Sequence, residues 1–384
     1  MTTRPTTLPT TMRAAVYHGR EDIRFEDVPV PEPPPGELLL EVGTAGVCGS
    51  DVGEWAHGPH QHWFDAPHPA TGHQGPIIPG HEFSGTVVAV GDGVDPSWIG
   101  TPVASCGSVA CGRCDACTRG QSNQCRWYAG VGLHRHGALA EYVVTPPENC
   151  LSVADTGLTL DEAALCQPMS IAVHNVSRAG DVRGQSVVVL GVGGIGTFLV
   201  YALAESGAEV LAADVDPARL ELATELGARR TVLVTGDSES DVTTLREQVG
   251  SDDLRVVFEV SGSASGVSTA VELAPRGCRI VLVGIQKAPV EIDLGTVTME
   301  EKILIGTNAL VREVDFPRAV ELVSRRAGRW AVIAPRVVPL ESYVDEALRP
   351  MSLGRPTAIK TLVDPRAHQV RPLRSGGNVA RSAS

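Results

Sequence analysis

The chain has 384 residues, of which 43% are hydrophobic and 20% charged, and it carries a formal net charge of −13. That length predicts a globular protein of about two domains, and the acidic excess argues against nucleic acid and anionic membranes as partners. No stretch approaches the roughly 18 unbroken apolar residues of a membrane span. Because no export signal opens the chain, we expect a cytoplasmic protein.

Both ends of the chain are predicted to be disordered tails. Residues 1–11 are rich in Thr and Pro, and residues 366–384 combine four arginines with Gly and Ser and show no apolar periodicity. Segments of this composition bury too little apolar surface to offset the entropy of ordering them.

Residues 12–149 predict a β-rich domain. Short strand-like runs such as "ELLLEVG" and "SGTVVAVG" alternate with Gly and Pro, and few stretches have the length and periodicity of a helix. Two short segments of this region, "GVCGSD" and "PGHEFSG", contribute Cys48, His81 and Glu82. Taken singly, a cysteine or histidine is more often a core or surface residue than a metal ligand.

Four cysteines gather in "CGRCDACTRGQSNQC", at Cys111, Cys114, Cys117 and Cys125. Two C-x-x-C steps that share a cysteine, closed by a fourth, can fold a loop around one tetrahedral zinc ion. Disulfides are the alternative that the missing export signal disfavours, and an iron–sulfur cluster is also possible. A site closed by four sulfurs leaves no position for a substrate, so this zinc would be structural.

After a predicted helical segment at residues 159–180, strands and helices alternate. Strand-length apolar runs such as "QSVVVLGV", "AEVLAADV", "LRVVFEVSG" and "CRIVLVGI" are separated by amphipathic segments such as "DPARLELATELGA". This alternation indicates an α/β domain with a parallel sheet covered by helices on both faces.

A glycine triplet between the first of these strands and its helix predicts a dinucleotide site. Gly191, Gly193 and Gly196 have G-x-G-x-x-G spacing, which permits a tight turn and lets a pyrophosphate approach the helix N-terminus. Asp214 ends the next strand, where a carboxylate accepts the ribose hydroxyls and repels a 2′-phosphate, so NAD is favoured over NADP. The alternative, a glycine turn followed by a helix cap, fits Asp216 better, because that residue precedes Pro217.

These motifs together resemble the zinc-containing medium-chain alcohol dehydrogenases, in their polyol and butanediol dehydrogenase branch. The resemblance runs through "CGSD", "GHEFSG", the cysteine lobe, "GALAEY", "QPMSIAVH", "GVGGIG", "FEVSG", "DFPRAVEL" and "AIKTLV". It implies a GroES-like catalytic domain at residues 12–170 and 310–365, with a structural zinc lobe at 106–128, and a Rossmann NAD-binding domain at 171–309. It also implies a homo-oligomer, a tetramer or a dimer, paired through the last strand of the nucleotide domain.

The same resemblance assigns the site residues. Cys48 and His81 would bind a catalytic zinc, with Glu82 as a ligand or near neighbour, and Ser50 would carry the substrate proton. Further cofactor contacts would come from Gly194, Ile195, Arg219 and Val283. The implied reaction is hydride transfer between NAD and a secondary alcohol or its ketone, such as a polyol, a vicinal diol or a hydroxylated ring, assisted by a zinc ion that makes the hydroxyl more acidic.

Two positions depart from the family pattern. Gln167 stands in "CQPMSIAVH" where the branch usually has Glu, and it would serve as a neutral ligand or hold a water molecule. Gly53 stands where many relatives have a proton-relay histidine. These departures keep open a zinc-independent reductase, or a redox-inactive NAD-binding protein, of the same fold. A zinc-ribbon protein that binds nucleic acid is disfavoured, because it would need basic patches.

Overall fold

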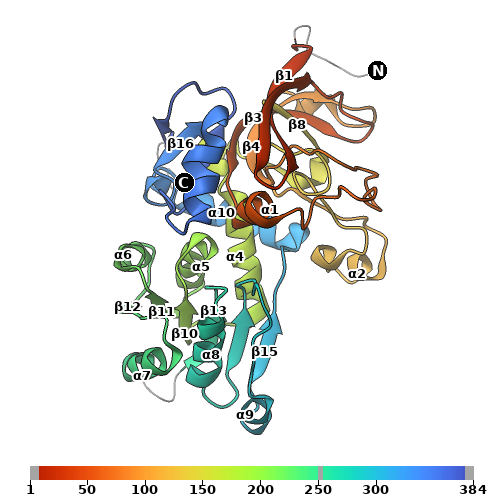
Figure 1. The fold of residues 1–384 in the computed structure, drawn as a ribbon. Helices are drawn as coiled ribbons and strands as arrows, with labels where there is room; N and C mark the ends of the chain where they lie inside the picture. The colour runs from red at the N-terminus through yellow and green to blue at the C-terminus, as the bar shows by residue number, and fades with distance from the viewer. Residues whose placement is uncertain (1–7, 250–253, 377–384) are drawn as a thin grey trace, which may run out of the picture. The chain divides into compact units, whose positions relative to one another are not determined.

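The computed structural model describes residues 8–249 and 254–376. The chain divides into two compact units (Figure 1): unit 1 comprises Met1–Ser170 with Leu310–Ser384, and unit 2 comprises Ile171–Ala309. The two units are described separately below.

Unit 1 is built on an eight-stranded sheet with the strand order β18-β16-β17-β3-β4-β5-β9, in which β8 also pairs with β3. The central strand β3 opens with three consecutive leucines, Leu38, Leu39 and Leu40, which are all fully buried. A strand buried on both faces reads as an apolar run rather than as an alternation. The strands of this sheet are β3 (Leu38–Gly46), β4 (Glu82–Val90), β5 (Pro102–Ser105), β8 (Tyr142–Thr145), β9 (Cys150–Ser152), β16 (Arg336–Pro339), β17 (Leu362–Asp364) and β18 (Arg371–Pro372).

A hairpin precedes this sheet and corrects the expected N-terminal tail. Strands β1 (Thr11–Gly19) and β2 (Asp22–Pro29) pair antiparallel, with Thr11 opposite Pro29. Ordered structure therefore includes the last residue of the segment expected to be disordered, because its backbone joins this ladder. Residues 1–7 lie outside the described residues. A second two-stranded sheet joins β6 (Ser108–Val109) to β7 (Ala129–Gly130).

Short helices connect the strands of unit 1. The α-helices are α1 (Gly49–His57), α2 (Asp115–Thr118), α3 (Leu160–Ala163), α10 (Arg312–Arg325) and α11 (Arg349–Ser352). The 3₁₀ turns are η1 (Pro96–Trp98), η2 (Ser122–Gln124), η3 (Pro147–Asn149), η4 (Trp330–Val332) and η5 (Leu340–Ser342), and η6 (Val344–Leu348) is a π-helical turn.

The segment predicted as helical at residues 159–180 forms two helices rather than one. Helix α3 ends at Ala163, and α4 (Cys166–Ala179) begins three residues later. Pro168 explains the break, because it has no N–H to donate and its ring would clash with the carbonyl of the preceding turn inside a continuous helix. In the first turn of α4 the missing N–H costs nothing.

The C-terminal segment differs from the disordered tail expected from residue 366 onward. Residues 366–376 are ordered because Arg371, in β18, binds two carboxylates: its Nη2 lies 2.9 Å from Oδ1 of Asp161 and 2.8 Å from Oδ2 of Asp364. The backbone N–H of Gly376 also donates to Glu162. Composition could not reveal these long-range partners. Residues 377–384 lie outside the described residues.

Unit 2 contains a six-stranded parallel sheet with the order β12-β11-β10-β13-β14-β15. This is the doubly wound order of a Rossmann fold, and it confirms the predicted α/β domain. Helix α5 packs beside α6, and α7 beside α8 (Figure 1). The strands are β10 (Ser186–Leu190), β11 (Glu209–Asp214), β12 (Arg230–Leu233), β13 (Leu254–Glu259), β14 (Arg279–Leu282) and β15 (Ile303–Gly306). The helices are α5 (Gly194–Glu205), α6 (Pro217–Glu225), α7 (Ser238–Val249), α8 (Ala264–Leu273) and α9 (Leu294–Met299).

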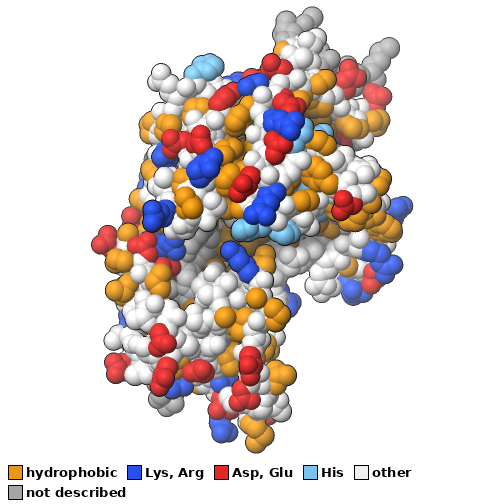
Figure 2. Space-filling model, in the orientation of Figure 1, with side chains coloured by type: hydrophobic (Ala, Val, Ile, Leu, Met, Phe, Trp, Pro, Cys, Tyr) orange, Lys and Arg blue, Asp and Glu red, His pale blue; other side chains and the backbone are white. Residues whose placement is uncertain are grey.

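The surface view in Figure 2 shows acidic and basic side chains intermixed over the visible face. Within residues 8–249 and 254–376, no helix combines the length and apolarity needed to cross a bilayer.

Candidate active site and metal centres

Three strand ends of unit 1 converge on one set of polar side chains. Cys48 follows β3, and Glu82 opens β4, which pairs antiparallel with β3 so that Gly46 lies opposite Glu82. Strand β17 pairs with the same end of β3, and Lys360 lies just before β17. Residues that are far apart in the sequence are thereby held side by side by backbone hydrogen bonds.

Cys48, His81 and Glu82 form a group that fits a metal ion. Their candidate ligand atoms all lie within 4.8 Å of one another, and His81 and Glu82 are buried. Gly46 makes room for this group, because a Cβ added there would lie 2.3 Å from Oε2 of Glu82. Thiolate, imidazole and carboxylate are the donors that zinc takes in catalytic sites.

Asp51, which the sequence reasoning missed, supports two of these residues. Its Oδ2 accepts a hydrogen bond from the Cys48 N–H at 2.9 Å, and its Oδ1 lies 3.6 Å from Nδ1 of His81. Burial would lower the pKa of His81, but the negative charges of Cys48 and Asp51 raise it to about 10. A site with this excess of negative charge suits a cation. The available signal was an acidic residue three positions after a helix cap.

Lys360 is a second residue that the sequence reasoning missed, although it lies in the quoted motif "AIKTLV". Its buried ammonium donates to both carboxylate oxygens of Glu82, at 2.9 and 2.7 Å, and to the Val47 carbonyl at 3.0 Å. Burial opposes this charge, yet Glu82 and Cys48 hold the pKa of Lys360 above its usual value. With zinc, Cys48, Glu82 and the buried Asp51 the formal charge would be −1, and Lys360 brings it to zero.

Ser50 and Gln167, the other two predicted catalytic residues, lie on helices α1 and α4. Ser50 lies in the first turn of α1, and its buried Oγ has no hydrogen-bond partner among the described residues. Its hydrogen-bonding capacity is therefore unused within the described part of the chain. Gln167 is 8% exposed in the first turn of α4, and its backbone carbonyl accepts a hydrogen bond from Ser170. A metal contact from its side chain stays a prediction.

Gly53 leaves space where many relatives have a relay histidine, and two histidines of the following loop are held by hydrogen bonds to the backbone. A Cβ added at Gly53 would meet no atom within 4 Å, so this position is open. In the following loop, Nδ1 of His62 lies 2.9 Å from the Leu133 carbonyl, and Nδ1 of His68 accepts from the N–H groups of Ala70 and Thr71. These two buried histidines order the loop.

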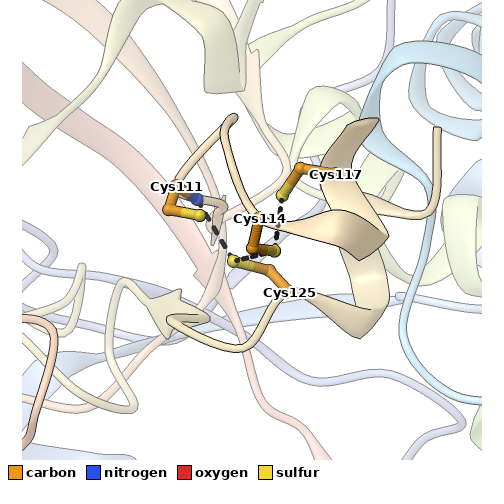
Figure 3. Close-up of side chains that lie close together, drawn as sticks. All are labelled: Cys111, Cys114, Cys117 and Cys125. Atoms are coloured by element: carbon orange, nitrogen blue, oxygen red, sulfur yellow. Dashed lines mark hydrogen bonds between the residues drawn. The ribbon is translucent and has the colours of Figure 1, made fainter. Parts of the chain in front are cut away.

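The four cysteines of the lobe lie together around a common centre (Figure 3), with their sulfurs within 4.8 Å of one another. The Sγ of Cys114 is 3.5 Å from that of Cys117 and 3.9 Å from that of Cys125. A tetrahedral zinc with bonds of about 2.3 Å requires sulfurs about 3.8 Å apart. Backbone N–H groups of Cys117 and Arg126 lower the pKa of Cys114 to about 6, which favours the thiolate that binds metal.

In the glycine triplet of unit 2, Gly191 and Gly196 are required by the backbone, whereas Gly193 borders open space. Gly191 has φ +97°, and a Cβ on Gly196 would lie 2.0 Å from the Gly191 carbonyl oxygen, so neither position accepts a side chain. A Cβ on Gly193 would meet no atom nearer than Arg219, at 3.9 Å. Space at the N-terminus of α5, where Gly194 and Ile195 begin the helix, is what an approaching pyrophosphate needs.

Asp214 braces this turn through hydrogen bonds to the backbone. Its Oδ2 accepts the N–H of Val192 at 2.6 Å, and its Oδ1 accepts the N–H of Asp216 at 3.0 Å. Each oxygen keeps a second lone pair for a ligand. Arg219 lies 3.6 Å from Oδ2, and Asp216 caps α6 by accepting the N–H of Ala218, which confirms its expected role. A cavity of about 390 Å³ opens beside Gly193, Asp214 and Arg219.

Val283 lies directly after β14, at the carboxyl edge of the same sheet. Its N–H donates to the Glu259 carbonyl at 2.8 Å, and the Glu259 carboxylate accepts the N–H groups of Ser261 and Gly262. Glu259 thereby joins the loops that follow β13 and β14. Ligands of doubly wound sheets bind outside this edge.

A Rossmann unit with a glycine-rich turn and a second unit with two groups of side chains that fit a metal ion are typical of a metal-containing, dinucleotide-dependent oxidoreductase. Residues 34–155 match the family described as alcohol dehydrogenase GroES-like domain, and residues 194–325 match the zinc-binding dehydrogenase family. The chain belongs to the zinc-containing medium-chain alcohol dehydrogenases, in the polyol dehydrogenase branch. It is an oxidoreductase that acts on CH–OH groups.

Individual relatives support this assignment over most of the chain. The erythritol/L-threitol dehydrogenase of Mycolicibacterium smegmatis is 32% identical over 343 residues, which cover 88% of this chain and 93% of the relative. The structure of 2R,3R-butanediol dehydrogenase from Bacillus subtilis aligns with a TM-score of 0.83 and 29% identity, over 92% of this chain and 99% of the other. A zinc-binding dehydrogenase from Sinorhizobium meliloti, bound to NADP, aligns with a TM-score of 0.80 and 29% identity, over 93% and 100%.

Proposed function

We propose that the protein transfers hydride between NAD and a secondary alcohol or its ketone, with a polyol, a vicinal diol or a hydroxylated ring as substrate. The observation that carries this proposal is the group Cys48, His81 and Glu82 together with the unpartnered Oγ of Ser50. Cys48, His81 and Glu82, with Gln167 as a neutral neighbour, would hold a catalytic zinc, which supplies Lewis-acid assistance to the substrate hydroxyl. The cysteine lobe would hold a structural zinc.

The residues of the chain would remove the substrate proton and support the metal ligands, and the cofactor would take the hydride. NAD, when bound, would accept the hydride that the substrate C–H bond releases, and the Ser50 hydroxyl would take up the O–H proton. Gly53 leaves open the position where a relay histidine would lie, so the proton passes from Ser50 to water. Asp51 orients His81, and Lys360 balances the charge of Glu82.

The substrate class can be tested with a panel of diols, polyols and cyclitols, by following NADH absorbance at equal protein concentration. We expect turnover of at least one vicinal diol or polyol and two zinc ions per chain by metal analysis. Activity with primary alcohols alone would contradict the proposed substrate class. A single zinc per chain would contradict the catalytic metal.

We expect Asp214 to set the choice of cofactor. In the unmutated protein its carboxylate repels a 2′-phosphate, so kcat/KM should favour NAD. Asp214→Ser removes that charge and releases Arg219, 3.6 Å away, to bind the phosphate. The NAD preference should then narrow by about tenfold, which corresponds to about 1.4 kcal/mol. Equal use of both cofactors by the unmutated protein would contradict this role.

Replacing Gln167 with Glu tests the neutral residue beside the proposed zinc. With Asp51 and Lys360 included, the added carboxylate changes the formal charge of the site from zero to −1. We expect zinc to resist chelators for longer, and the pH profile of kcat/KM for oxidation to move upward by about one unit, because the added charge disfavours loss of the substrate proton. Gln167→Asn is the matched control, since it keeps the site neutral. Identical pH profiles for Gln167→Glu and the unmutated protein would place Gln167 outside the site.

We also propose a homo-oligomer that pairs through the edge strand β15. Ile303 on this strand is 50% exposed, and Met299 at the end of α9 is 77% exposed, which leaves apolar side chains beside an unpaired ladder edge. Light scattering should give two or four times the chain mass of 40.4 kDa. A species of the single-chain mass alone would contradict the proposal.

A cytoplasmic location is proposed as well. A reducing compartment would keep the four thiols of the cysteine lobe available for zinc. Fractionation of cells that produce the protein, with NADH-forming activity as the readout, tests this location.

A further inference from the structure

Tyr343 carries a buried hydroxyl that has no hydrogen-bond partner among the described residues. It lies between η5 and the π-helical turn η6, and its side chain is fully buried. Buried hydroxyl groups almost always have a partner, because an unsatisfied one loses its bonds to water without replacement. A phenylalanine would pack equally well at this position. The hydroxyl of Tyr343 therefore requires an explanation of its own.

The Asp51 carboxylate, in contrast, can accept more hydrogen bonds than the described residues donate to it. Its side chain is buried, yet the described residues give its carboxylate one hydrogen-bond donor, the N–H of Cys48, while Nδ1 of His81 lies 3.6 Å away. An ionised carboxylate has room for about four hydrogen bonds. Unit 1 therefore buries the Tyr343 hydroxyl, which has no acceptor among the described residues, and the Asp51 carboxylate, which has room for further donors.

These two groups lie within electrostatic reach of one another. Burial and the nearby charges of Asp51, Cys48 and Glu82, of which Asp51 acts most strongly, raise the pKa of Tyr343 well above its usual value. The turn η6 also packs against α1, the helix that contains Asp51. The Tyr343 hydroxyl makes no direct hydrogen bond to a described residue, and a buried water can link two polar groups that do not bond directly.

We propose that the Tyr343 hydroxyl donates, through one buried water, to the Asp51 carboxylate and so holds Asp51 in place to orient His81. Tyr343 is then a positioning residue that acts on the metal site through Asp51. The inference rests on the proposed catalytic metal at Cys48, His81 and Glu82. Groups that orient a metal-ligating histidine typically change metal affinity by 10- to 100-fold when they are removed.

The test compares Tyr343→Phe with the unmutated holoenzyme by zinc competition with a chelator, using Cys48→Ala to define the signal of the cysteine-lobe zinc. We expect the zinc at the Cys48 site to bind about tenfold more weakly in Tyr343→Phe. The melting temperature of the zinc-stripped protein should not fall, because the hydroxyl donates to no described residue. With cobalt(II) in place of zinc, the thiolate-to-metal absorption band should shift.

Tyr17→Phe is the matched control. The Tyr17 hydroxyl is also buried, but it donates to the Glu54 carbonyl at 2.9 Å, so its removal should lower the melting temperature and leave zinc affinity unchanged. If Tyr343→Phe binds both zincs as the unmutated protein does and shows the same cobalt spectrum, the role of Tyr343 is overturned while the catalytic metal stands. If the unmutated protein binds only the lobe zinc, the proposed function itself fails.

Discussion

Replacement of Cys48 by alanine is expected to remove the zinc proposed to bind at Cys48, His81 and Glu82. It should also reduce turnover by roughly a thousandfold or more. Cys48 is the only thiol in that group. Without the metal, the substrate hydroxyl loses an interaction that contributes several kcal/mol to charge stabilisation in the transition state. The measurement is zinc content beside kcat/KM with NAD and the best substrate of the panel.

Cys278→Ala provides the control for losing a thiol. Cys278 is 2% exposed in unit 2 and belongs to neither cysteine-containing group, so this variant should keep two zinc ions and its activity. Should Cys48→Ala retain both its second zinc and its turnover, the catalytic-zinc interpretation is wrong. The zinc-independent reductase of the same fold would then replace it.

Cys114→Ser is expected to release the zinc of the cysteine lobe and to lower the melting temperature by about 10 °C or more. Structural zinc contributes about 10 to 16 kcal/mol of apparent binding free energy in small zinc-finger peptides, and each kcal/mol lost shifts the melting temperature of a domain of this size by about 2–4 °C. The lobe is also tied to α10, because Ser122 donates to Glu313 at 2.8 Å. Loss of zinc should therefore loosen more than the loop itself.

Arg119→Ala is the matched variant within the lobe. Arg119 is exposed and pairs with Asp115 through a surface ion pair at 3.3 Å, an interaction worth about 0–1 kcal/mol. Its loss should leave zinc content and melting temperature nearly unchanged. The measurements are calorimetry and metal analysis of both variants. A Cys114→Ser protein that melts like the unmutated chain would show that the lobe does not depend on metal.

The alternating part of the fold could be predicted from the sequence because its signals are local. The apolar run of β10, the glycine turn and the helix that follows lie within about twenty residues, and each imposes its own periodicity on the chain. The four cysteines were predictable as one site for the same reason, since they lie within fifteen consecutive residues. Helix α7 was not predicted, because its apolar face consists of only three residues, Val242, Leu245 and Val249, in an otherwise polar sequence.

Partners that come from distant parts of the chain were decided by the tertiary structure alone. Lys360 meets Glu82 because β17 pairs with the end of β3, a register that no local pattern contains. Arg371 orders the C-terminal segment by binding Asp161, 210 residues earlier, although its composition indicated a tail. The sequence by itself determined the α/β unit, the glycine turn and the kinds of metal donor present. Which charges surround those donors depended on strand pairing and burial, because only folding brings residues of such sequence separation into contact.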